Sequence, residues 1–337
     1  MLRDTRRFSP GARKLAGVAT FALMALGGLA LPTQAQDKTT IQYQQAFAPS
    51  AADLPLYTAQ AKGFFEEEGI EVTIRSSQDA ANAVTLVGIG DADIGISYPP
   101  DILLAHAKGI PVMGIWAKYQ INPMGIVSLE DEANIATPAD LKGKRIGLTP
   151  LPIDQTLFDA VLDNAGLTRD DVEIFNPGFN GGQMVGEKKL DGASAVPWYE
   201  VDQLKANGMK PVLMEYREHG GIDFPFMTLI TNRDFAETNP EVLKAFLRAL
   251  RKGFEYSKEH PQEALDFLIE AEPALNRASQ ELTMKTVAPM RETEATAEHG
   301  LGYLDIGELQ QLADFLYARD LLEDEVDAGD VFTNEYR

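Results

Sequence analysis

The hydrophobic pattern of the first hundred residues alternates between strands and helices. Apolar and polar positions alternate at 41–43 and again at 71–74, which predicts two short strands. A helical pattern covers 54–63, with a proline where the first turn tolerates one and a glycine at its end. A helix over 80–87 and a strand over 94–97 come next. This order of strands and helices predicts a parallel sheet.

The same order of elements recurs further along the chain. A capping box at 137–140 leads into a strand over 145–148, and one apolar stripe over 153–165 predicts a helix that Gly166 ends. A strand, a short helix and another strand then follow over 172–175, 183–190 and 193–196. Two α/β lobes of one design explain this recurrence.

The rest of the pattern predicts how the two lobes share the chain. Strands over 211–214 and 226–230 are expected to complete the second lobe. The helices that follow have no strand partners of their own, so we expect them to pack on the first lobe. They are predicted over 240–254, 261–270, 277–290 and 306–318. The predicted fold class is therefore α/β with two lobes, each a mostly parallel sheet flanked by helices.

Domain boundaries follow from this assignment. The first lobe is expected over 36–124, the second over 125–230, and residues 231–337 return to the first lobe and add the C-terminal helices. Glycine and proline residues occur at the two places where the chain is predicted to pass between the lobes. We therefore predict hinges over 122–128 and 220–231.

The first 35 residues have the composition of a secretory signal peptide. Five basic residues precede an apolar run over 15–31, and small residues follow as far as Ala35. Pro32 bounds the apolar run, which argues against a retained membrane span. The pair Arg6-Arg7 leaves a twin-arginine export route open beside general secretion. The sequence thus predicts an exported protein cleaved after residue 35.

Cysteine and charge content narrow the possible partners. The chain has no cysteine, so it has no disulfide, no thiolate ligand and no lipid-anchor cysteine. The whole chain carries a net charge of −21, and residues 1–35 carry five basic groups and one acid, so the remainder carries −25. Such a surface repels nucleic acid and anionic membranes. We expect a free, monomeric periplasmic protein without stable membrane insertion.

The stretch 191–200 is the strongest candidate for a ligand site. Small and β-branched residues up to Val196 suit a strand buried on both faces, and Pro197 should end it. Trp198, Tyr199 and Glu200 follow at once. Ligands of open α/β sheets bind at the carboxyl ends of strands, so these three side chains are expected at a binding crevice. The alternative is an aromatic-capped strand end with a solvated glutamate.

Catalytic and cofactor signatures are absent from the sequence. The glycines at 88–90 lack the third glycine of a dinucleotide fingerprint and precede a strand instead of following one. The four histidines, at 106, 219, 260 and 299, have no metal-ligand spacing. Asp154, near the start of a helix, is expected to complement the helix dipole. We therefore expect no catalytic residue, no metal and no cofactor.

Four segments carry a resemblance to a known family. They read LPLYTAQAKGFFEEEGIEV (54–72), DADIGISYPPDILLAHAKGIPV (91–112), ATPADLKGKRIGL (136–148) and GEKKLDGASAVPWYEVDQL (186–204). They resemble substrate-binding proteins of ABC importers for thiamin-pyrimidine precursors. The same group contains binders of riboflavin, alkanesulfonates and nitrate. The resemblance implies a type II periplasmic binding fold, a small heteroaromatic ligand, and permease and ATPase subunits as partners.

The resemblance also implies which residues contact the ligand. Phe47 corresponds to an aromatic residue of the pyrimidine site, and Tyr57 and Tyr98 keep the tyrosines of the family. Ser50 replaces a characteristic asparagine, and Asp53 replaces a frequent histidine. Trp198, Tyr199 and Glu200 match an aromatic, aromatic, glutamate run near the ligand. The expected ligand is a hydroxymethyl- or formylamino-pyrimidine, with riboflavin, alkanesulfonate or nitrate as alternatives.

One branch of this family is enzymatic. It contains a fungal-type pyrimidine synthase whose lysine and histidine fall in a segment matching 95–101. This chain has Ser97 and Asp101 there, and it cannot contain the cysteine motif of the enzyme. The resemblance therefore favours a binding protein over a synthase.

Overall fold

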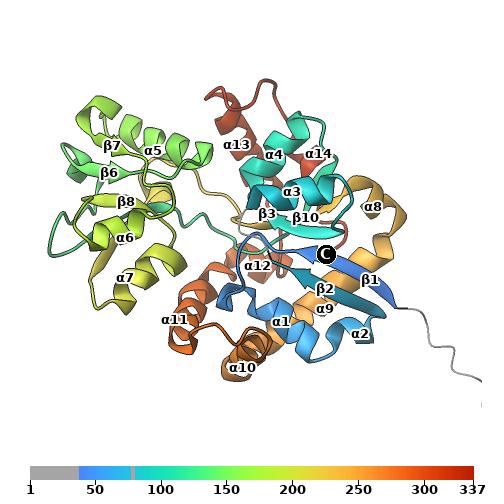
Figure 1. Cartoon of the computed structure of the whole chain (residues 1–337). Coiled ribbons are helices and arrows are strands. Elements are labelled where there is room, and N and C mark those ends of the chain that lie inside the picture. The colour runs from blue at the N-terminus through green and yellow to red at the C-terminus, as the bar shows by residue number, and fades with distance from the viewer. Residues whose placement is uncertain (1–37, 77–79) are drawn as a thin grey trace, which may run out of the picture. The chain divides into compact units, whose positions relative to one another are not determined.

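The structure is a computed structural model that describes residues 38–76 and 80–337. The predicted signal peptide, residues 1–35, lies outside the described residues. Two five-stranded sheets form the framework of residues 38–337 (Figure 1). Each sheet is the centre of one lobe.

The first sheet has the strand order β2-β1-β3-β10-β4. β1 pairs in parallel with both β2 and β3, whereas β10 pairs antiparallel with both β3 and β4. Four strands thus run in one direction and only β10 runs against them, as the predicted mostly parallel sheet requires. The strands are β1 (Thr39–Gln44), β2 (Ile70–Arg75), β3 (Ile94–Ser97), β4 (Val112–Ala117) and β10 (Thr228–Asn232).

The second sheet repeats this arrangement with the order β7-β6-β8-β5-β9. β6 is parallel to β7 and β8, and β5 is antiparallel to β8 and β9. The two sheets therefore share one topology, which confirms the recurrence in the sequence. The strands are β5 (Gly125–Leu129), β6 (Arg145–Gly147), β7 (Glu173–Phe175), β8 (Gly192–Ala195) and β9 (Pro211–Glu215).

Helices flank both sheets. In Figure 1, α3 and α4 lie on one side of the first sheet, and α1 and α9 lie on the other. The stacked rings of Tyr43, Phe246 and Phe65 fix α9 and α2 against β1. The helices are α1 (Leu54–Ala61), α2 (Phe64–Glu67), α3 (Ala80–Gly88), α4 (Pro99–Ala107), α5 (Pro152–Asn164), α6 (Gly181–Gly186), α7 (Asp202–Ala206), α8 (Arg233–Thr238), α9 (Pro240–Glu259), α10 (Pro261–Ala271), α11 (Arg277–Val287), α12 (Glu294–His299), α13 (Ile306–Tyr317) and α14 (Ala328–Val331).

Strand β10 corrects one prediction. The strand expected over 226–230 was assigned to the second lobe, but β10 lies in the first sheet between β3 and β4. The boundary predicted at residue 230 therefore falls inside a strand of the first sheet. A run of buried residues identifies a strand but not the sheet that accepts it.

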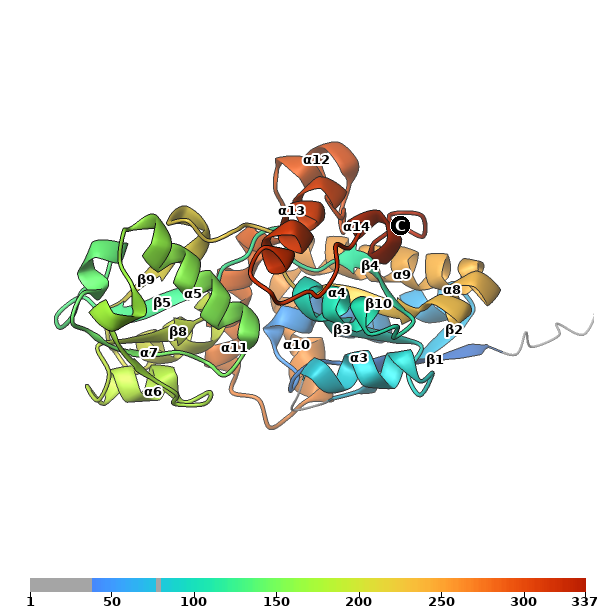
Figure 2. The ribbon, with the colours of Figure 1, turned by 90° about the horizontal axis from the view of Figure 1, so that it is seen from above.

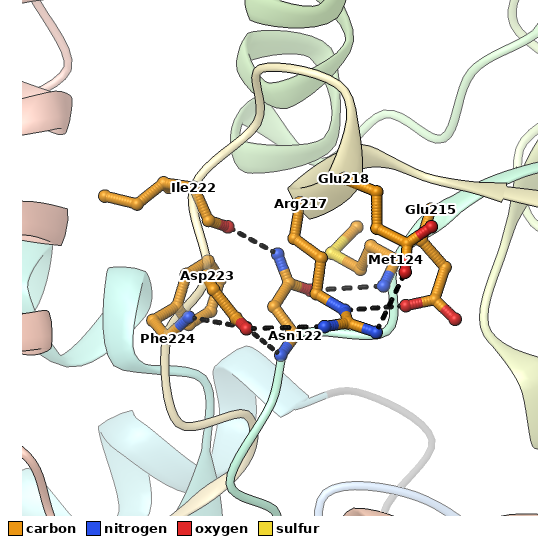
Figure 3. Close-up of polar contacts among 8 residues, drawn as sticks. All are labelled: Asn122, Met124, Glu215, Arg217, Glu218, Ile222, Asp223 and Phe224. Carbon is orange, nitrogen blue, oxygen red and sulfur yellow. Dashed lines mark hydrogen bonds and ion pairs between the residues drawn. The ribbon is translucent and has the colours of Figure 1, made fainter. Parts of the chain in front are cut away.

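Two crossovers, 118–124 and 216–227, connect the sheets. The hinge ranges predicted from the sequence, 122–128 and 220–231, overlap these crossovers and also include residues of β5 and β10. Figure 3 shows that polar contacts join the crossovers to each other. The backbone N–H of Asn122 donates to Asp223 Oδ1 at 2.7 Å, and its side chain donates to the Ile222 carbonyl at 3.3 Å. Asn122 Oδ1 in turn accepts from the N–H of Met124 at 3.2 Å. That these segments act as hinges stays a prediction.

The C-terminal helices pack on the first lobe with one exception. Figure 2 shows α8 and α9 along the first sheet and α11 beside the second. Gln280 of α11 accepts from the N–H of Ala51 in the first lobe at 2.7 Å. Thr286, on the same helix, donates to Asp202 of α7 in the second lobe at 3.0 Å. The expectation that these helices pack on the first lobe alone is therefore wrong for α11, which contacts both lobes.

None of the helices in the described part of the chain is both long enough and apolar enough to cross a membrane.

Candidate functional site

The turn after β8 positions the side chains on which the sequence prediction rests. β8 ends at Ala195, and Pro197 begins a π-helical turn, Pro197–Val201, that leads into α7. This confirms that the proline ends the strand. Glu200 Oε2 accepts a hydrogen bond from the N–H of Val196 at 2.9 Å, so the carboxyl group folds back over the strand end. Isolated π-turns occur often at functional sites.

Glu200 is held in an environment that opposes its ionisation. Its side chain is partly buried and packs against the backbone of Gly182 in α6, where a Cβ would lie 2.7 Å from Glu200 Cγ. Burial raises the pKa of Glu200 to about 7. The hydrogen bond from Val196 lowers this pKa, and the charge of the nearby Asp154 raises it by a smaller amount. A carboxyl group with this pKa can change between acceptor and donor near neutral pH.

Aromatic side chains from both lobes meet beside this turn. The ring centroids of Trp198 and Tyr119 are 5.0 Å apart, and those of Trp198 and Phe226 are 6.0 Å apart. The contacts continue from Phe226 to Tyr98 at 4.9 Å and from Tyr98 to Phe47 at 6.4 Å. We call these five residues the aromatic cluster. Each such pair contributes roughly 0.5–1.5 kcal/mol beyond its buried area.

The topology explains why these five rings converge. Phe47, Tyr98 and Tyr119 follow β1, β3 and β4, so they lie at the carboxyl ends of strands that run in one direction. Phe226 precedes β10, which runs in the opposite direction, and so it lies at the same edge of the sheet. Trp198 holds the corresponding place after β8 in the other sheet. This is the edge at which open α/β sheets bind ligands.

Two members of the cluster, Tyr119 and Phe226, were not among the predicted site residues. Backbone hydrogen bonds join them, from Tyr119 to Phe226 at 3.1 Å and from Phe226 to Tyr119 at 2.9 Å. Tyr119 is fully buried, yet its hydroxyl has no hydrogen-bond partner. Met227, the next residue after Phe226, has a φ of +57°, a left-handed conformation that a bulky side chain adopts rarely. Such strain is concentrated at functional sites.

The structure places the predicted site residues in different environments. Phe47, Tyr98 and Trp198 belong to the aromatic cluster, and Glu200 lies beside it on the same turn as Trp198. Tyr199 is 61% exposed. Tyr57 lies on α1 and packs against α10, and its hydroxyl donates to Glu272 at 3.2 Å. A ligand contact stays a prediction for all of them.

Ser50 and Asp53 have structural partners in this structure. Ser50 caps the short 3₁₀ helix Ala51–Asp53, and its hydroxyl accepts from the N–H of Ala52 at 3.2 Å. Asp53 Oδ2 accepts from the N–H of Ser50, and Oδ1 pairs with Lys118 Nζ at 2.6 Å. Both charged side chains are largely buried, with exposed fractions of 13% for Asp53 and 14% for Lys118.

We expect Asp53→Ala to lower the free energy of unfolding by about 1–3 kcal/mol, because it leaves the Lys118 ammonium largely buried and unpaired. Asp53→Asn should lower the free energy of unfolding by less, since it retains the acceptor for the Ser50 N–H. Urea unfolding followed by circular dichroism measures both. A ligand contact of Ser50 and Asp53 stays a prediction, and unchanged stability together with lost ligand affinity in Asp53→Ala would support it for Asp53.

Asp154 has a larger role than the one expected from its helix position. It is fully buried, and it accepts hydrogen bonds from the hydroxyls of Ser194 at 2.5 Å, Thr149 at 2.7 Å and Tyr216 at 3.0 Å. Burial raises the pKa of Asp154, and these hydrogen bonds oppose the rise. Asp154 therefore connects β6, β8 and the second crossover beneath the turn that carries Glu200.

No group of three or more histidine or acidic side chains in residues 38–76 and 80–337 is arranged to hold a metal ion. Two cavities, of about 360 Å³ and about 500 Å³, lie away from the aromatic cluster, and none of its five rings lines either of them. The rings instead pack against one another.

Residues 51–264 match the family described as NMT1/THI5 like, which is more than half of the chain. The chain belongs to the NMT1/THI5-like family. Over 319 residues it is 28% identical to the formylaminopyrimidine-binding protein of Halalkalibacterium halodurans, covering 93% of this chain and 96% of that protein. A 4-amino-5-hydroxymethyl-2-methylpyrimidine phosphate synthase of Candida albicans is 29% identical over 221 residues, covering 63% and 65% of the two chains.

Solved structures establish the fold of this NMT1/THI5-like protein. The periplasmic aliphatic sulphonate-binding protein SsuA of Escherichia coli superposes with a TM-score of 0.68 at 15% identity. The match covers 88% of this chain and 99% of SsuA. The fold is that of the periplasmic binding proteins, as the sequence predicts.

Proposed function

We propose that this protein is a periplasmic substrate-binding protein that captures a small pyrimidine of the thiamin-precursor class and delivers it to an ABC importer. The observation that carries the proposal is the aromatic cluster with Glu200 beside it. Rings from the first lobe and Trp198 from the second form a π-surface between the sheets, and Glu200 supplies a hydrogen-bonding carboxyl group at its border. The permease and ATPase subunits of an importer are the expected partners.

A pyrimidine suits this surface for two reasons. Its flat face can stack on Trp198, Phe226 or Tyr98, and stacking of a base on an aromatic ring is worth roughly 1–3 kcal/mol. Its ring nitrogens and exocyclic amino group need hydrogen-bond partners, and Glu200 and the unpaired Tyr119 hydroxyl are available. Aromatic walls with a few placed polar groups are typical of small-molecule sites.

We infer that the protein is not an enzyme. The binding protein of Halalkalibacterium halodurans aligns over 93% of this chain, whereas the Candida albicans synthase aligns over 63%. Ser97 stands in the segment where the resemblance places the lysine and histidine of the synthase, and its side chain is fully buried. The predicted export of the chain also favours a binding role outside the cytoplasm.

One observation favours the alkanesulfonate alternative. The Arg291 guanidinium lies 5.6 Å from the ring centroid of Tyr119, and it has no carboxylate partner among the described residues. Its Nε is buried without a hydrogen-bond partner, although another nitrogen donates to the Ala52 carbonyl at 2.6 Å. An anionic group placed at the edge of the aromatic cluster would satisfy this charge.

Isothermal titration calorimetry with three ligand classes tests the proposal. We expect a formylaminopyrimidine to bind with one-to-one stoichiometry and a dissociation constant of about 1 μM or lower. Butanesulfonate and riboflavin should bind at least tenfold more weakly. Absence of formylaminopyrimidine binding would overturn the proposal, and tighter binding of butanesulfonate would favour the alternative.

A further inference from the structure

Helix α11 contacts both halves of the candidate site. It lies between α7 and α10 in both Figure 1 and Figure 2. Toward the first lobe it packs on the 3₁₀ helix Ala51–Asp53, which follows Phe47 in the chain. Toward the second lobe it packs on α7 and on the π-helical turn that carries Trp198 and Glu200. The helix therefore connects segments on the two sides of the proposed ligand site.

The first lobe holds α11 by apolar packing and by a buried hydrogen bond. Met284 packs against the buried apolar cluster of α1 and α10 that includes Leu54 and Leu265. Gln280 is 8% exposed, and its Oε1 accepts from the N–H of Ala51 at 2.7 Å. Breaking this contact would expose apolar surface and leave the Ala51 N–H unpaired, and both changes cost free energy. We therefore expect α11 to move with the first lobe.

The contact of α11 with the second lobe is polar and incompletely satisfied. The Thr286 hydroxyl donates to Oδ1 of Asp202 at 3.0 Å, and Asp202 is 5% exposed. Oδ2 of the same carboxyl group is buried without a hydrogen-bond partner. The apolar cluster around Val201 and Leu204 in the second lobe includes no residue of α11. Separation of α11 from α7 would let water hydrate Oδ2, so this contact is easier to break than the packing on the first lobe.

We propose that α11 is a strap that moves with the first lobe and, through Thr286, holds the turn of Trp198 and Glu200 against that lobe. Asp202 is two residues beyond Glu200, so the hydrogen bond acts directly on this turn. Separation of the two lobes breaks the hydrogen bond between α11 and α7. Thr286 is therefore a positioning residue that governs how fast ligand leaves. Its effect on ligand rests on the proposed function, whereas the contact between the lobes does not.

Hydrogen exchange of the ligand-free protein, followed by mass spectrometry, tests the strap without any ligand. Thr286→Val removes the hydroxyl and keeps the shape of the side chain. We expect peptides covering 197–206 and 277–287 to exchange about tenfold faster in this variant. Thr286→Ser keeps the donor and should behave as the wild type does. The matched control is Thr238→Val, which should change neither segment, because the Thr238 hydroxyl donates to the Asp234 carbonyl within α8.

The dissociation rate of formylaminopyrimidine measures the effect of the strap on ligand. Thr286→Val should release it about tenfold faster, with a nearly unchanged melting temperature of the ligand-free protein. The chain has no cysteine, so a double variant, Thr286→Cys with Asp202→Cys, can be cross-linked by dibromobimane at this contact alone. Without the cross-link it should release ligand as fast as Thr286→Val does. With the cross-link, formed while ligand is bound, release should be about tenfold slower than in the wild type.

Three outcomes would overturn the strap. They are unchanged hydrogen exchange in Thr286→Val, an equal effect of Thr286→Ser, and release of ligand from the cross-linked protein at the wild-type rate. A lower melting temperature of Thr286→Val without faster exchange would give Thr286 a purely structural role, which also contradicts the proposal. If formylaminopyrimidine does not bind, the proposed function fails, and hydrogen exchange still decides whether α11 holds the lobes together.

Discussion

Replacing Trp198 by alanine is expected to weaken binding of the pyrimidine ligand by about tenfold or more. Trp198 is the one ring that the second lobe contributes to the aromatic cluster, where it contacts both Tyr119 and Phe226. Loss of one stacking partner removes roughly 1–3 kcal/mol, and about 1.4 kcal/mol corresponds to tenfold in affinity. Calorimetric titration of the variant measures this loss directly.

The other tryptophan provides a matched control. Trp116 is 5% exposed and packs in the first lobe against Gly302 and the Arg251 guanidinium. Trp116→Ala should lower the melting temperature more than Trp198→Ala does, because it opens a cavity in the core, and it should leave affinity nearly unchanged. Trp198→Phe, which keeps a ring, should bind with intermediate affinity. Full affinity in Trp198→Ala would remove this residue from the ligand site.

The second large effect is a dependence of affinity on pH. Glu200 has a pKa of about 7 because burial disfavours its charged form. If the ligand donates a hydrogen bond to Glu200, it binds the ionised carboxylate, and affinity should rise about tenfold between pH 6 and pH 8. Glu200→Gln should bind about tenfold more weakly at pH 8 and lose the pH dependence. Calorimetry at several pH values, with ligand whose own titration is known, tests this expectation.

Glu200 also makes the stability of the protein depend on pH. Whereas ligand affinity is expected to rise with pH, stability is expected to fall. A carboxyl group in an unfolded chain has a pKa near 4.3, so between about pH 4.5 and pH 7 the folded protein holds a proton that the unfolded chain releases. The free energy of unfolding therefore falls as pH rises through this window, by up to about 4 kcal/mol from Glu200. Burial also raises the pKa of Glu308 to about 7, so the wild-type curve contains both groups.

Comparison of wild type with Glu200→Gln isolates the Glu200 contribution, since Glu308 is common to both proteins. The difference between their unfolding free energies should change between pH 5 and pH 8, and urea titrations at these pH values measure it. A constant difference over this range, together with an affinity that does not change with pH, would exclude a titrating Glu200 in the site.

Local sequence signals predicted the end of the strand at the site correctly, although not the π-helical turn that follows it. Small and β-branched residues before Pro197 define β8 and its end within one residue, because proline cannot continue the ladder. The positions of glycine and proline residues predicted the bounds of α1 and α5 equally well. These features depend on residues that are neighbours in the sequence.

The missed features depend on partners that are distant in sequence. The sequence of Phe226 and β10 does not indicate which sheet the strand joins. Only the pairing of β10 with β3 and β4 brings Phe226 to Tyr98. No helix was predicted over 99–107, where Pro99 and Pro100 form the first turn of α4 directly after β3. No element was predicted over 112–117, and so Tyr119, just after β4, could not be assigned to a strand end.

The place of β10 in the first sheet has a consequence for biosynthesis. The second sheet is encoded by one uninterrupted segment, 125–215, which can pair its strands as soon as it has been synthesised. The first sheet is interrupted, because β3 and β4 have no strand between them until residues 228–232 arrive. Unpaired strand edges promote aggregation, and pairing across such a long sequence separation is slow. We therefore expect the lobe whose synthesis begins first to complete its folding last.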